Sequence, residues 1–132
     1  MEKPTLEVIK NGERLVTMSE IILIDKSITI KELKHLASLR FGDLVKAVVD
    51  VEKKIMAIGG ELHADEEEFL LRSGSLQKDL WGINIYADLP KDSWVEFDSM
   101  INIRSAQGNR SRGIESKELQ DKISKIVNSL IN

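Results

Sequence analysis

Short runs of alternating hydrophobic and polar residues mark the first part of the chain. Two such runs between Thr5 and Met18 flank Asn11-Gly12, a dipeptide that favours the positive φ angles of a type I′ turn, and they predict a hairpin. "EIILID" then predicts a short strand. Thr29 and Glu32 follow with capping-box spacing, so we expect a helix that begins near Ile30 and ends near Gly42.

The segment "DLVKAVVDVEKKIMAIGG" fits both helical and strand periodicity. We interpret it as two strands, because a valine run lowers helix propensity and Gly59-Gly60 is costly inside a helix. The second of these strands is expected to reach His63. "ADEEEFLLRSG" then predicts a short helix capped by Asp65, with its glutamates near the positive end of the helix dipole.

Two clear strands and a long helix complete the chain. "DLWGINIYAD" and "WVEFDSMINIR" alternate strictly, and an apolar stripe after Ser116 predicts an amphipathic C-terminal helix. The order of elements predicts an α+β fold, a single domain with a mainly antiparallel sheet and helices packed on one face. Residues 1–19 would form an N-terminal hairpin extension, and residues 20–132 the domain.

Strand parity divides the last two strands into two faces. One face is apolar and is expected under the helices: Trp81, Ile83, Ile85, Val95, Phe97, Ser99, Ile101 and Ile103. The other combines glycine, short polar side chains and aromatics: Gly82, Asn84, Tyr86, Trp94, Glu96, Asp98, Met100, Asn102 and Arg104, with Glu61 and His63 from the preceding strand. Asn, Asp and Gly disfavour strands, so this polar face is a candidate site.

Register within the predicted hairpin sharpens this hypothesis. If Tyr86 pairs with Trp94, Asn84 faces Glu96 and Gly82 faces Asp98, which leaves a gap with Gly82 as its floor. The loop "RSAQGNRSRG" adds Arg104, Arg110 and Arg112, whose guanidinium groups suit an anion.

Two candidate catalytic residues, His63 and Asp98, follow from this arrangement: His63 would act as acid or base and Asp98 would orient it or a water molecule. Asn84, Asn102, Arg104, Arg110 and Arg112 are the candidate ligand-binding residues. Each element of this site has a structural alternative. His63 would be a hydrogen-bonded histidine at a strand end, and Asp98, Asn102 and Arg104 would form a cross-strand ladder. The arginine loop would be a solvated or helix-capping loop. Trp94 and Tyr86 would stack on a ligand or stiffen the hairpin.

The amino-acid composition limits the partners and the metal ligands that the protein could have. A formal net charge of -3 over 132 residues gives no bulk attraction to nucleic acid or anionic membranes, and the absence of cysteine excludes disulfides and thiolate ligands. Glu61, His63 and Asp65 have spacing that a metal could use, but we expect neither a metal nor another cofactor. No apolar run approaches a membrane span or a signal peptide, so we expect a cytoplasmic protein with no membrane partner.

Three strings carry a resemblance to a known family: "GELHAD" (60–65), "DLWGINIY" (79–86) and "FDSMINIRSAQGNRSRG" (97–113). From Ile21 onward the chain resembles a family of short bacterial proteins catalogued only as a domain of unknown function. The resemblance implies a small cytoplasmic bacterial protein and no particular activity. "MSEIILID" looks like the usual family start, so residues 1–17 are either a true extension or the product of a start codon placed too early.

Three function hypotheses remain open. The first is a domain that binds an anionic small molecule on the polar face, with or without acid/base chemistry at His63. The second is a nucleotide- or RNA-binding module that uses the arginine loop and an aromatic residue for stacking. The third is a protein-protein or homodimer surface anchored by Met100 and Trp94.

Overall fold

The computed structural model describes residues 8–10, 13–15 and 20–132. Seven strands are assigned within these residues: β1 Val8–Lys10, β2 Glu13–Leu15, β3 Ile22–Ile24, β4 Val45–Asp50, β5 Ile55–Ile58, β6 Leu80–Ile85 and β7 Val95–Glu96. Three α-helices accompany them: α1 Ile30–Arg40, α2 His63–Arg72 and α3 Lys117–Leu130. Short 3₁₀ helices cover Gln77–Asp79, Lys91–Ser93, Met100–Asn102 and Ser105–Gln107.

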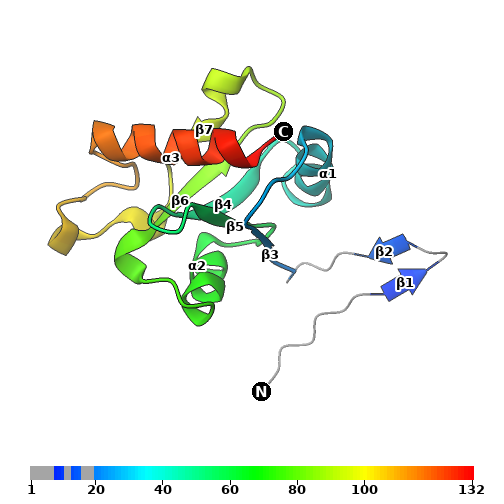
Figure 1. The fold of residues 1–132 in the computed structure, drawn as a ribbon, viewed down its shortest axis with the longest axis horizontal. Coiled ribbons are helices and arrows are strands. Elements are labelled where there is room, and N and C mark those ends of the chain that lie inside the picture. Colours follow the sequence, from blue (N-terminus) through cyan, green and yellow to red (C-terminus); the bar gives the residue numbers. More distant parts are fainter. Residues whose placement is uncertain (1–7, 11–12, 16–19) are drawn as a thin grey trace.

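Strands β3 to β7 form one antiparallel sheet in the order β3-β5-β4-β6-β7, which confirms the predicted α+β class (Figure 1). β1 and β2 pair antiparallel in a separate ribbon with Val8 opposite Leu15, and the predicted turn at Asn11-Gly12 lies outside the described residues. The ambiguous segment forms two strands, β4 and β5, as interpreted from its valines.

The start and the end of α1 are set by the residues that the sequence indicated. The hydroxyl of Thr29 accepts a hydrogen bond from the backbone N–H of Glu32, and the Glu32 carboxylate accepts one from the backbone N–H of Thr29, which completes the capping box. The hydrogen bonds that the Glu32 carboxylate accepts from the backbone N–H and the hydroxyl of Thr29 lower the pKa of this carboxyl below its ordinary value. At the other end, Gly42 has a φ of 92°, and its N–H bonds back to the carbonyl of Ala37.

Two hydrophobic clusters lie on opposite faces of the sheet. The larger lies beneath α1 and α3 and contains Trp81, Ile83 and Ile85 of β6 together with buried residues of both helices: Leu33, Ala37, Ile123, Ile126, Val127 and Leu130. The smaller joins Val48, Ala57 and Leu80 to Leu70 of α2. Figure 1 shows α3 and α2 on either side of the sheet, so α2 is the α-helix that covers the face opposite the main core within the described residues.

β7 is much shorter than predicted. The strand ends at Glu96, and a 3₁₀ turn at Met100–Asn102 replaces the expected continuation. The alternation predicted for residues 97–104 is therefore wrong beyond Phe97: Ile101 packs with the smaller cluster rather than the main core, and Ile103 is exposed. Trp94, expected on the polar face, is buried in the main core, where its indole N–H donates to the carbonyl of Leu89.

Candidate functional site

A cavity of about 250 Å³ opens where the first turn of α2 meets the sheet and the bend that follows β7. We call it the α2 pocket. Its lining residues are Lys46, Leu62, His63, Ala64, Asn84, Asp98, Ser99, Met100, Ile101 and Arg112. Four of the predicted site residues are among them: His63, Asn84, Asp98 and Arg112.

The register of the sheet brings three polar side chains into one row on this face. Lys46 of β4 lies opposite Asn84 of β6, and Asn84 lies opposite Glu96 of β7 as predicted. Directly opposed residues in antiparallel strands project from the same face. Sequence reasoning missed Lys46, although a single charge inside the apolar run "LVKAVV" was a usable signal.

Asn84 is held in one orientation. Its amide Nδ2 donates to Glu96 Oε1 at 2.9 Å and reaches the carbonyl of Asp98 at 3.5 Å, and the hydroxyl of Tyr86 donates to the same Glu96 oxygen at 3.1 Å. Reversing the amide would point its oxygen at a carboxylate. The Asn84 Oδ1 atom is buried and has no hydrogen-bond partner, so the pocket wall contains an unused acceptor.

His63 is the first residue of α2, not the end of a strand. β5 ends at Ile58, and Gly59 adopts a φ of 91°, which turns the chain away from the sheet. Asp65 does not cap the helix as predicted; Leu62 occupies the N-cap and provides no side-chain hydrogen bond. Among the described contacts, the backbone N–H groups of His63 and Ala64 have no acceptor, so the positive end of α2 opens into the pocket.

The protonation of His63 follows from its surroundings. Burial lowers the pKa of the imidazole below its ordinary value, and nearby Lys46 adds to that effect, while a hydrogen bond to the Ile83 carbonyl opposes it. The ring is therefore neutral at pH 7. Because a carbonyl only accepts, the Nε2 atom at 2.7 Å carries the proton, which leaves Nδ1 as an acceptor. Ile83, not Asp98, holds the ring.

Asp98 and Arg112 form an ion pair at the pocket. Asp98 Oδ1 lies 2.7 Å from Arg112 Nε, and both side chains are partly exposed. The pairing engages one edge of the guanidinium group. Lys46 differs, because no carboxylate within the described residues lies at ion-pair distance; its ammonium group lies 5.2 Å from the centre of the exposed Phe41 ring.

The remaining predicted site residues lie outside the pocket lining. Asn102 is fully buried, and its amide replaces the missing end of β7: Oδ1 accepts from the N–H of Gly82, while Nδ2 donates to the carbonyls of Gly82 and Arg112. Arg104 donates to the carbonyls of Gln77, Leu80 and Ile101, and it lies over the Trp81 ring. These two side chains connect backbone segments.

The arginine loop does not gather its cations in one place. Asn109 organises the loop by donating to the carbonyls of Asn102, Ser111 and Gly113. Arg104 lies beside Glu67 at 3.5 Å, whereas Arg112 pairs with Asp98. Arg110 is exposed and lines no part of the α2 pocket.

Gly82 is not an open floor. A β-carbon at this position would lie 2.6 Å from both Cβ and Oγ of Ser99, so Ser99 already fills the predicted gap. The usable space lies further along β6, beside Asn84.

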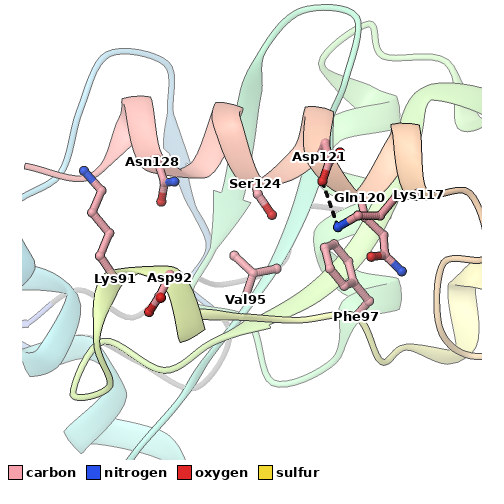
Figure 2. A pocket seen from close by; sticks show the side chains of 9 residues that line it. All are labelled: Lys91, Asp92, Val95, Phe97, Lys117, Gln120, Asp121, Ser124 and Asn128. Atoms are coloured by element: carbon pink, nitrogen blue, oxygen red, sulfur yellow. Dashed lines mark ion pairs between the residues drawn. The ribbon is translucent and has the colours of Figure 1, made fainter.

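Two other cavities offer less chemistry. One of about 360 Å³ lies between α3 and the segment 91–97, where Figure 2 shows Val95 and Phe97 pointing toward the helix. All its lining residues are exposed or half-buried, and its Lys117 is paired with Asp121 at 3.1 Å. The other, of about 710 Å³, runs along β3 and α1, and its Glu32 serves the helix cap.

The fold and the pocket thus define a small α+β domain with a partly buried polar site on the face that α2 covers. Residues 22–130 match the family of proteins of unknown function designated DUF5674, and the chain belongs to this family. Neither a curated protein nor a solved structure matches the chain.

Two further findings concern metals and membranes. The part of the chain that the structure describes contains no group of three or more histidine, aspartate and glutamate side chains arranged to hold a metal ion. Its helices also lack the combination of length and apolar character needed to cross a membrane.

Proposed function

We propose that the protein binds an anionic small molecule, a phosphorylated or carboxylated compound, in the α2 pocket. One observation carries this proposal: Lys46, which has no ion-pair partner among the described residues, and an uncapped helix N-terminus line the same cavity. Backbone N–H groups at a helix N-terminus bind anions directly, and the helix dipole favours negative charge there. The anionic group would contact the N–H groups of His63 and Ala64 and the ammonium group of Lys46.

The charges of the neighbouring residues support this assignment. Among the described residues, Asp98 is the only carboxylate that lines the pocket, and it pairs with Arg112. Glu96 is engaged by Asn84 and Tyr86. Lys46 and the N-terminus of α2 therefore supply positive charge to this pocket on a protein whose formal net charge is -3.

The nucleic-acid and dimer alternatives have less support. Trp94 is buried in the core and offers no stacking surface, and the arginines are dispersed rather than aligned along a strand-binding path. Met100 is 65% exposed, but it stands at the rim of a polar cavity rather than within an apolar patch that also contains Trp94.

Amide-resolved NMR titration tests the proposal. Inorganic phosphate, glycerol 1-phosphate and glycerate would be titrated into the ¹⁵N-labelled protein. We expect the largest chemical-shift changes at the amides of His63 and Ala64. We expect Lys46→Met to weaken binding by about tenfold to 150-fold, the loss of one charge-assisted contact.

Lys125→Met is the matched control, because Lys125 is exposed on α3. The substitution removes the same charge far from the pocket. Its affinity should equal that of the wild type. If all three compounds leave the His63 and Ala64 amides unchanged, or if Lys125→Met weakens binding as much as Lys46→Met, the proposal is wrong.

A further inference from the structure

One wall of the α2 pocket consists of acceptors rather than donors. Asn84 Oδ1 is buried and unpartnered, and the contacts of Nδ2 with Glu96 and Asp98 keep the amide from turning. The neutral ring of His63 adds a second acceptor, Nδ1, because its Nε2 proton is committed to the Ile83 carbonyl. A carboxylate without hydroxyl groups, such as acetate, has no O–H to donate and satisfies neither group.

Resting on the proposed function, we infer that the natural ligand carries hydroxyl groups beside its anionic group, and that these donate to Asn84 and His63. The pocket then discriminates a hydroxylated phosphate or carboxylate from its deoxy analogue. The chemical basis is the cost of leaving the buried Asn84 Oδ1 acceptor unpaired: a ligand hydroxyl recovers that free energy, whereas a methylene group in the same place does not.

The arrangement divides the ligand into two ends. The anionic end faces Lys46 and the first turn of α2, and the hydroxylated end faces Asn84 of β6 and the His63 ring. A volume of about 250 Å³ suits a compound of a few carbon atoms with one phosphate or carboxylate group. The exposed side chains of Leu62 and Met100 stand at the rim, so larger substituents would contact apolar surface there.

Two matched pairs of compounds test the inference. Glycerol 1-phosphate differs from propyl phosphate only in its hydroxyl groups, and glycerate differs from propionate in the same way. Calorimetric or NMR titration of the wild-type protein should give a dissociation constant at least about fivefold lower for the hydroxylated member of whichever pair binds, as expected for one recovered hydrogen bond.

Variants then locate the discrimination. Asn84→Ala removes one acceptor, and His63→Phe removes the other while keeping an aromatic ring of similar size. Each should bring the affinity ratio toward one. Lys46→Met should weaken both members of a pair by the same factor and leave the ratio unchanged. Circular dichroism identifies variants that remain folded, and either acceptor variant is sufficient.

The outcomes separate the two proposals. Equal binding of both members of a pair by the wild type overturns the inference and leaves the anion site standing. A preference that stays at its wild-type value in a folded Asn84→Ala or His63→Phe variant also overturns it, because the hydroxyl groups would then be recognised elsewhere. If no member of either pair binds, the proposed function fails and the inference fails with it.

Discussion

Gly82→Ala gives a direct test of how β6 meets the bend beside the α2 pocket. Gly82 has no positive φ, so alanine meets no backbone penalty there. The penalty is steric: the new β-carbon would lie 2.6 Å from Ser99 Cβ and Oγ and 3.1 Å from Ile101 Cγ1. Since carbon atoms pack at about 3.5–4.0 Å, Ser99 must move by about 1 Å.

Ser99 has little freedom to make that movement. It is 2% exposed, its N–H donates to the Arg112 carbonyl at 3.0 Å, and its hydroxyl accepts from the N–H of Ile101. Overpacking of this kind costs about 1–3 kcal/mol, and the lower chain entropy of unfolded alanine offsets about 0.4–1 kcal/mol. We therefore expect Gly82→Ala to lower the free energy of unfolding by about 1–2 kcal/mol.

Urea denaturation measures this change, with Gly113→Ala as the matched control. A β-carbon at Gly113 would find its nearest neighbour, the Phe97 carbonyl, at an ordinary 3.5 Å, so this variant should stay within about 0.5 kcal/mol of the wild type. Adding Ser99→Gly to Gly82→Ala should recover part of the loss. If Gly82→Ala is as stable as Gly113→Ala, the close approach of β6 and Ser99 is not as described.

Three other predictions follow from the core, a buried carboxyl group and the charge distribution. Ile123→Ala should lower the free energy of unfolding in urea by about 2–5 kcal/mol, because Ile123 is fully buried on the inner side of α3; a loss below about 1 kcal/mol would contradict its place in the core. Burial raises the pKa of the Glu66 carboxyl well above its ordinary value of 4.5, against the opposing hydrogen bond from the Gly60 N–H, so the folded protein keeps a proton that the unfolded chain releases. The contribution of Glu66 to the free energy of unfolding is thus fully present below pH 4.5 and is lost as pH rises. The stability of Glu66→Gln relative to the wild type should therefore increase by up to about 1.4 kcal/mol per pH unit. A difference in stability that does not change with pH would refute this. A fluorescent RNA oligonucleotide should show no tight binding near physiological salt, whereas a steep salt dependence weakened by Arg110→Ala would favour the RNA-binding alternative.

Part of the site was accessible from the sequence because strand parity is local. The alternation of "GINIY" and "WVEF" placed Asn84 and Glu96 on one face, and the hairpin register paired them correctly. The same parity failed beyond Phe97. It assumes a continuous strand, and nothing in "DSMINIR" announces that the side-chain amide of Asn102 takes over the backbone pairing of Gly82.

The pocket itself required tertiary information. Lys46 and Asn84 are 38 positions apart and meet only through the register between β4 and β6. The uncapped start of α2 became part of the site because Gly59 ends β5 and the chain crosses to the opposite face of the sheet. Arg104 and Asn102 are residue types that often bind ligands. Only their contacts with distant carbonyl groups show that they connect backbone segments here.

The sequence by itself determined the elements whose signals lie within a few residues of one another: the capped helix α1, the valine-rich strands, the β6 strand and the apolar stripe of α3. These depend on backbone propensity, periodicity and capping, which short-range contacts decide. Tertiary structure decided the end of β7, the face that α2 covers and the set of side chains in the α2 pocket. Those features depend on which buried polar groups find hydrogen-bond partners far away in the chain. The local sequence pattern does not predict these long-range pairings.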